Sequence, residues 1–305
     1  MSLVLMAVIF TVLIRVGGWD DLRQAFSEAR PVYILAAIFA HFCVIFGGAP
    51  LLWHFIVTLL GARPPLSEAY RLWLGVLCLR AILPMKAGSF VVGPNYLRLH
   101  HGLPFSRGAG SMALYHFINF YTLWVYLAVG LWWTGRAGVW LLALLTGAIG
   151  VVPFILPWMR VPVDWIGKRH RRVGDLLGHL VGGFTDISLP MRLRLIGIGC
   201  VFQLVDFMAI GLCLRAAGID VPLAELLWRA PGVFLIANLP VTFMGLGTRE
   251  AAMVAFFAPF GGKAAALAGG LIMSFSISFV PALVSLFFLP QALRMGLFSE
   301  MTNDE

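Results

Sequence analysis

Charged side chains are scarce in this chain, and their scarcity excludes a soluble protein. Only 12% of the 305 residues are Asp, Glu, Lys or Arg, while 60% are hydrophobic and the mean hydropathy is +0.91. Soluble globular domains carry about 25% charged residues. The composition therefore predicts an all-α polytopic integral membrane protein, with a single membrane domain over residues 1–305.

The chain also lacks the usual arrangements of catalytic and metal-binding side chains. Its four cysteines stand singly in apolar segments, without the spacing of a disulfide framework or a metal site. The seven histidines show no ligand spacing, and no Ser/His/Asp triad or carboxylate pair is recognisable. We therefore expect no metal, no cofactor and no enzymatic activity.

What the chain has instead is long uncharged runs. Four of them exceed the roughly 20 residues that a transmembrane helix requires: Pro31–Ala62, Gly108–Gly135, Ala137–Met159 and Ala264–Leu293. Leu195–Leu214 forms another span, and Ser2–Ile14 is interpreted as a first membrane helix rather than a signal peptide. About six full spans are expected.

Basic residues are concentrated in two segments. Thirteen of the 22 Lys and Arg residues lie between Arg63 and Arg107 or between Arg160 and Arg194. Cytoplasmic loops are enriched in Lys and Arg, so both segments are predicted to face the cytoplasm, as are both termini. A membrane surface accounts for the net charge of +8 without a nucleic-acid partner.

Similar short stretches recur about 156 residues apart. "AILPMKAG" resembles the start of "ANLPVTFMGLGTRE", "GARPPLSEA" resembles "GIDVPLAEL", and "PFSRGAGS" resembles "PFGGKAAA". The order is the same each time, which predicts a duplicated unit. Its two copies are residues 32–133 (repeat A) and 192–289 (repeat B), and they are separated by a linker span, 137–159, and a basic cytoplasmic segment, 160–194.

Each copy interrupts an apolar segment at Leu-Pro. The pieces beside the breaks, Arg71–Leu83 and Arg249–Pro259, are too short to span a bilayer. We therefore expect two re-entrant hairpins of broken helices. One linker span between the copies would make the repeats inverted, as in many secondary transporters. The predicted hairpin breaks are Pro84, Gly88, Pro240, Gly245 and Gly247.

The two Leu-Pro blocks carry a family resemblance. "LPVTFMGLGTREAAM" and "LPMKAGSFVVGPNYLRLHHGL" resemble the two signature blocks of the lysylphosphatidylglycerol synthase transmembrane-region family. The resemblance covers about residues 1–295 and implies a flippase-like domain that moves lipids or lipid-linked sugars between leaflets. The chain departs from the family pattern at Ser89, where an acid is common, and at Tyr115 and His116, where a Glu-Arg pair is expected.

Several charged or polar residues at membrane depth are candidates for binding an anionic headgroup. Arg249 is suited either to a lipid phosphate or to an ion pair, and Glu250 complements the dipole of the helix it begins. Asp206 lies in the middle of a span, where an acid is costly, so it is either functional or part of an ion pair with Arg249 or Lys86. Lys86, Arg80 and Arg98 would either attract headgroups or set topology, and Asn238 would bond to backbone freed by the break.

These features predict a translocase for membrane lipids or lipid-linked intermediates in the cytoplasmic (inner) membrane of a prokaryote-like cell. Its anionic, phosphate-bearing headgroup would bind between the two re-entrant hairpins. Two alternatives remain open: a non-transporting membrane subunit of a lipid-modifying complex, and a membrane-embedded enzyme acting on lipid headgroups. Small residues such as Gly269 and Gly270 could pack between subunits, so a homo-oligomer is left open. The basic segment leaves open a partner protein from lipid biosynthesis.

Overall fold

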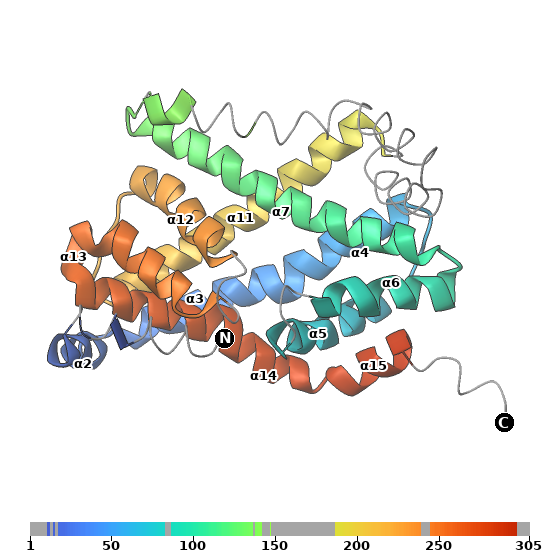
Figure 1. The fold of residues 1–305 in the computed structure, drawn as a ribbon, viewed down its shortest axis with the longest axis horizontal. Helices are drawn as coiled ribbons and strands as arrows, with labels where there is room; N and C mark the ends of the chain where they lie inside the picture. The colour runs from blue at the N-terminus through green and yellow to red at the C-terminus, as the bar shows by residue number, and fades with distance from the viewer. Residues whose placement is uncertain are drawn as a thin grey trace. The chain divides into compact units, whose positions relative to one another are not determined.

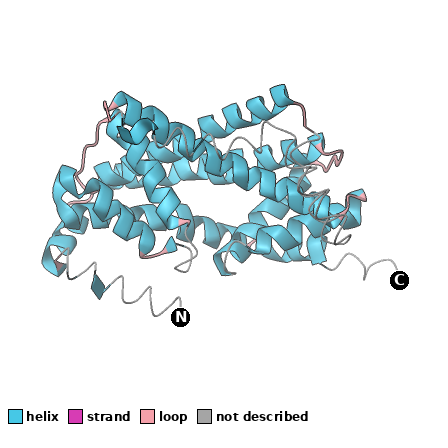
Figure 2. Ribbon diagram, turned by 45° about the horizontal axis from the view of Figure 1, so that its top comes forward, coloured by secondary structure: helices cyan, strands magenta, loops and turns pink. Residues whose placement is uncertain are grey.

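The computed structural model describes residues 11–12, 15, 18–82, 87–136, 138–141, 147, 187–238 and 245–297; within these ranges the side chains of 80–82, 87–89 and 297 are not described. The described residues form helices and loops, with no strand among them (Figures 1 and 2). This confirms the all-α prediction.

Four helical segments are long and apolar enough to cross a membrane: Pro31–Leu59, Phe105–Trp133, Leu189–Ala216 and Thr248–Leu286. They correspond to four of the six predicted spans. The chain is therefore an integral membrane protein. The predicted span Ala137–Met159, most of Ser2–Ile14 and most of the basic segment 160–194 lie outside the described residues.

Two of the spans are interrupted by π-helix. The first consists of α3 (Pro31–Phe42), the π-helix η1 (Cys43–Gly48) and α4 (Ala49–Leu59). The last consists of α13 (Thr248–Ser274), η5 (Phe275–Phe279) and α14 (Val280–Leu286). The other two are the single helices α7 (Phe105–Trp133) and α11 (Leu189–Ala216). The shorter helices are α2 (Trp19–Ser27), α5 (Leu66–Ile82), α6 (Ala87–His101), α12 (Leu223–Ala237) and α15 (Leu289–Leu297).

The chain turns in the same way after α4 and after α11. Gly61 (φ 95°) and Gly218 (φ 80°) both have the left-handed conformation that ends helices in Schellman motifs. Each glycine N–H donates to the carbonyl three residues back, and the next residue donates to the carbonyl five residues back. The carbonyls of Pro65 and Pro222 then accept the first bonds of α5 and α12. These equivalent turns lie 157 residues apart, the spacing of the sequence similarity.

The short helices differ in length from the predicted pieces. Helix α5 begins at Leu66 rather than Arg71, because the Pro65 carbonyl already accepts the N–H groups of its first turn. Helix α13 continues past Pro259 and is interrupted only at Gly262, whose φ of 85° is not helical. The limb that follows the second break is therefore Thr248–Gly261. Gly88 lies in the first turn of α6, just after the break.

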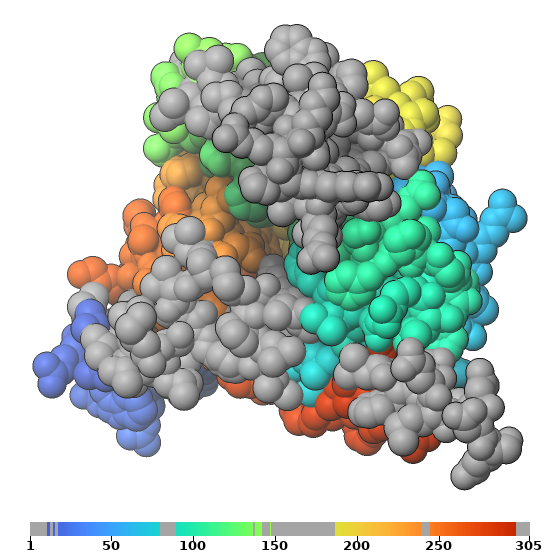
Figure 3. Space-filling model, turned by 45° about the vertical axis from the view of Figure 1, so that its right-hand side comes forward, coloured from blue at the N-terminus to red at the C-terminus, as the bar shows by residue number. Residues whose placement is uncertain are grey.

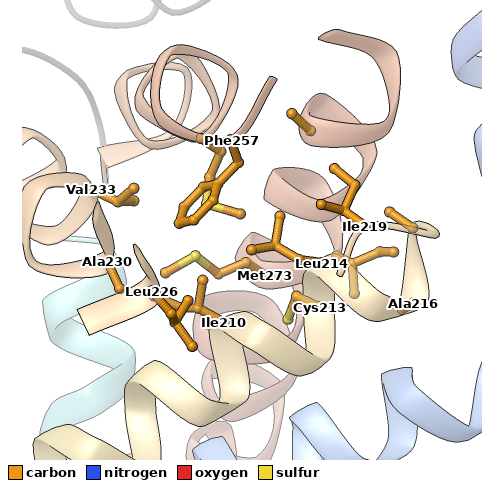
Figure 4. Close-up of a cluster of buried hydrophobic side chains, with 14 of the residues drawn as sticks. Ile210, Cys213, Leu214, Ala216, Ile219, Leu226, Ala230, Val233, Phe257 and Met273 are labelled. Carbon is orange, nitrogen blue, oxygen red and sulfur yellow. The ribbon is translucent and has the colours of Figure 1, made fainter. Parts of the chain in front are cut away.

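The chain divides into two compact units. In the unit formed by the described parts of 1–44, 123–144 and 202–281, α12 packs on α13, α13 on α2, and α3 on η5. Its apolar core includes Ile210, Leu226, Phe257 and Met273 (Figure 4). We call this unit 1.

The second unit comprises the described parts of 45–122, 145–201 and 282–305. Here α5 packs on α4 and α6, and α15 lies against both α5 and α6 (Figures 1 and 3). Close backbone contacts require glycine at two places: a Cβ at Gly75 would lie 2.2 Å from Ala292 Cβ, and one at Gly296 would lie 2.5 Å from a Val92 methyl carbon. We call this unit 2.

Candidate functional site

The break after α12 depends on two glycines. Gly245 (φ 74°) and Gly247 (φ 86°) have left-handed conformations that are costly for any other residue. A Cβ on Gly245 would also lie only 2.7 Å from the carbonyl oxygen of Ala237, near the end of α12. Asn238, which follows α12, donates from Nδ2 to the Phe234 carbonyl (2.8 Å), which also accepts the Asn238 N–H.

Glu250 lies in the first turn of the next helix, α13, and is completely buried. Its Oε2 accepts a hydrogen bond from the Gly247 N–H (2.5 Å), which completes the N-terminal cap of the helix. Its Oε1 accepts a hydrogen bond from the Ser274 hydroxyl. Both carboxyl oxygens therefore bond to the protein.

Arg249 is the buried cation of this site, with only 8% of its surface exposed. Its Nη1 donates to Ser274 Oγ (3.1 Å) and to Ser278 Oγ (3.0 Å). Ser274 thus connects the two neighbouring charges, because it bonds to both Arg249 and Glu250. A guanidinium held in this way keeps a planar set of donors in a fixed orientation, which suits the oxygens of a phosphate.

Ser274 is the last residue of α13, and Ser278 lies in η5, which follows it. They belong to the stretch "SFSISF", residues 274–279, where α13 passes into η5. Sequence reasoning missed them, although serine at every second position of an apolar span was a detectable signal. It also missed His41, which is completely buried and hydrogen-bonded to Ser276.

Asp206 lies in α11, as predicted, but Arg249 is not its partner. It makes no hydrogen bond or ion pair with any described residue, and its Oδ1 is buried. Gln203, one turn earlier on α11, is also buried. The other predicted partner, Lys86, lies outside the described residues. Asp206 is therefore a half-buried acid in a membrane span, the type of residue that usually marks a functional position.

Arg98 is exposed near the end of α6, in unit 2. The side chain of Arg80, together with Pro84 and Pro240, lies outside the described part of the chain.

Two of the three positions that depart from the family pattern, Tyr115 and His116, pack as rings in unit 2. Tyr115 packs edge-on against Trp73, with 4.8 Å between ring centroids, and His116 stacks on Phe90. Ring packing thus occupies the place of the expected Glu-Arg pair.

A second charged network ties α12 to its neighbours in unit 1. Glu225 accepts hydrogen bonds from Arg229 Nε and Trp228 Nε1, both at 2.8 Å, and lies 3.9 Å from Arg136. Both guanidinium groups also lie over the Trp228 ring, at 4.3 and 4.6 Å. Burial acts to raise the pKa of Glu225, but the bonds from Arg229 and Trp228 outweigh it, so the pKa lies below its ordinary value. Sequence reasoning did not identify this network.

Groups of His, Cys, Asp and Glu that could together hold a metal ion do not occur among the described residues. What the arrangement around Arg249 offers to a ligand is a buried positive charge and hydrogen-bond donors held in place by two serines.

Comparison with known proteins agrees with the membrane fold. No curated protein matches the chain. The family model described as "Lysylphosphatidylglycerol synthase TM region" matches residues 1–285. The chain therefore belongs to the lysylphosphatidylglycerol synthase transmembrane-region family, whose membrane domain is associated with lipid modification.

Proposed function

We propose that this protein moves an anionic, phosphate-bearing lipid, or a lipid-linked intermediate, between the leaflets of the cytoplasmic membrane. The observation that carries the proposal is Arg249, a buried cation at the start of a helix that follows a glycine break. A charge at membrane depth is costly and usually serves a substrate or ion pathway. Membership of a lipid-associated membrane family supports the same class of substrate.

The headgroup site is proposed to lie at the break between α12 and α13. Backbone N–H groups at a helix N-terminus attract anions, and the guanidinium of Arg249 adds a full charge there. The charge of Glu250 is opposite to that of Arg249, and its oxygens are held by the bonds from Gly247 and Ser274. In this proposal Glu250 holds the site together and Arg249 contacts the lipid phosphate.

The helix pairs α5–α6 and α12–α13 are proposed to be two re-entrant hairpins. In support, α5 packs on α6 within unit 2, and α12 packs on α13 within unit 1. Also within unit 1, the first turns of α12 lie beside the end of α7, where a Cβ on Gly130 would lie 2.6 Å from the Trp228 backbone nitrogen. The proposal includes an inverted orientation of the two repeats, because a single linker span separates them in the sequence.

Asp206 is proposed to couple transport to protons. A half-buried carboxyl without a partner among the described residues can gain or lose its proton without breaking a protein hydrogen bond. Protonation in one state of the transport cycle and ionisation in another would link lipid movement to the proton gradient.

The test is lipid translocation in proteoliposomes, with short-chain labelled anionic, zwitterionic and polyprenyl-phosphate lipids. We compare the wild type with Arg249→Lys, Arg249→Ala and Asp206→Asn, and use Arg215→Ala as a control because that side chain is half exposed. We expect the wild type and the control to move anionic lipid and the site variants to lose most of that movement while remaining folded.

Failure of the folded wild type to move any of these lipids would overturn the translocase proposal. The alternative of a non-transporting subunit would then gain support, because aromatic packing of Tyr115 and His116 replaces the charged pair expected in the first half. A chemically altered lipid would instead indicate an enzyme.

A further inference from the structure

Ser276 lies between the two serines that hold Arg249 but bonds to a different partner. Its hydroxyl lies 2.9 Å from Nδ1 of His41, and neither residue is exposed. The single hydroxyl hydrogen of Ser276 is donated to the Met273 carbonyl (3.0 Å). With that hydrogen engaged, Ser276 Oγ accepts from His41 in the tautomer that carries its proton on Nδ1, and it also lies 3.8 Å from Cys213 Sγ. His41 is the next-to-last residue of α3, and Ser276 lies in η5, which packs against α3.

The three serines at the junction of α13 and η5 are thus held from two sides. Residues two positions apart on a helix point in nearly opposite directions, so Ser276 faces away from Ser274 and Ser278. Arg249 bonds to the outer two serines and His41 bonds to the middle one. Single π-helical turns inside α-helices are frequently found at functional sites.

We propose that His41 is a positioning residue for the lipid site. Its bond to Ser276 sets the rotation of η5, and this rotation presents Ser274 and Ser278 to the guanidinium of Arg249. A histidine on α3, outside the α12–α13 hairpin, thereby orients the cation that binds the lipid phosphate. The lipid-binding part of this inference rests on the proposed function, whereas the coupling between His41 and the Arg249 serines does not.

The coupling is tested without lipid, by a double-mutant cycle on thermal unfolding of the purified protein. Ser278→Ala is introduced into the wild type and into His41→Leu. If His41 sets the rotation of η5, Ser278 no longer meets Arg249 in His41→Leu, and Ser278→Ala then loses most of its effect on the melting temperature. The control is Ser285→Ala, which removes a buried serine that bonds to the Ala282 carbonyl of its own helix and to the Cys78 thiol, and that has no contact with Arg249 or His41. Its effect should be the same in both backgrounds. Equal effects of Ser278→Ala in both backgrounds would overturn the proposal.

The functional consequence is tested by binding of short-chain phosphatidylglycerol in detergent. We expect His41→Leu and Ser276→Ala to bind this lipid about tenfold more weakly, because the donors on Arg249 lose their orientation. His41→Asn should restore most of the affinity, since its amide lies as many bonds from Cβ as Nδ1 does. The matched control is His54→Leu, the same substitution at a later position in the same span, Pro31–Leu59.

The two tests separate the two proposals. If His41→Asn binds no better than His41→Leu, the hydrogen bond to Ser276 has no positioning role and the inference is wrong. If the wild type binds no phosphatidylglycerol but the cycle shows coupling, the lipid proposal fails and the positioning of Arg249 by His41 stands.

Discussion

Glu68 and Glu225 occupy the same place in the two hairpins: each is the third residue of its hairpin's first helix, 157 positions apart. Glu68 accepts a hydrogen bond of 2.5 Å from Tyr96, on α6. Glu225 accepts bonds from Arg229, whose Nη1 in turn donates to the Phe256 carbonyl of α13. In each half, an acid at the open end therefore ties the first limb of the hairpin to the second.

Replacing Glu225 should destabilise unit 1. In Glu225→Gln the bonds to Arg229 and Trp228 lose their charge, and the free energy of unfolding should fall by about 1–3 kcal/mol. Asp220→Asn is the control, because Asp220 also pairs with an arginine but is 84% exposed, and exposed pairs contribute about 0–1 kcal/mol. Thermal unfolding in detergent measures both. A loss no larger for Glu225→Gln than for Asp220→Asn would mean that the network is not stabilising.

Substitution of the break glycines should be costly for conformational reasons. Gly245→Ala combines a positive φ, which costs about 1–2 kcal/mol for other residues, with a Cβ placed 2.7 Å from the Ala237 carbonyl. Gly197→Ala, in the middle of α11, meets no atom within 4 Å and should raise stability by up to about 1 kcal/mol. Melting temperatures of the two variants should therefore shift in opposite directions. A Gly245→Ala variant as stable as the wild type would contradict the described turn.

Ser274 should contribute to stability out of proportion to its size. Ser274→Ala removes one bond to Arg249 and one to Glu250, so two buried charged groups each lose a partner. We expect the free energy of unfolding to fall by about 1–3 kcal/mol. Denaturation of Ser274→Ala and Ser285→Ala, measured side by side, tests this. Equal losses would show that Ser274 does not connect the two charges.

Replacing Asp206 should abolish pH-driven transport without lowering the stability of the protein. Asp206→Asn removes an ionisable group that has no partner among the described residues, so the melting temperature should stay the same or rise. Lipid movement driven by a pH gradient should be lost, because the amide cannot take up a proton. Both quantities are measured on the same reconstituted variant. Retained pH-driven transport would exclude Asp206 as the coupling residue.

The spans and the turns could be predicted from the sequence. Transfer of apolar residues into a bilayer is favourable largely residue by residue, so long apolar runs identify helices such as α7 and α11 without knowledge of their neighbours. Glycines such as Gly61, Gly218 and Gly245 are informative for a similar reason. A positive φ is a local property of the backbone, and only glycine adopts it without strain.

The partners of Arg249 were decided by tertiary structure. Its serines lie 25 and 29 positions away, and His41, which contacts the serine between them, lies on a different span. Local patterns carry no information on which buried polar groups meet across helices, because such pairs form only once the helices have packed. The sequence alone determined that Arg249 and Glu250 follow a break in a membrane helix, and packing of η5 determined what holds them there.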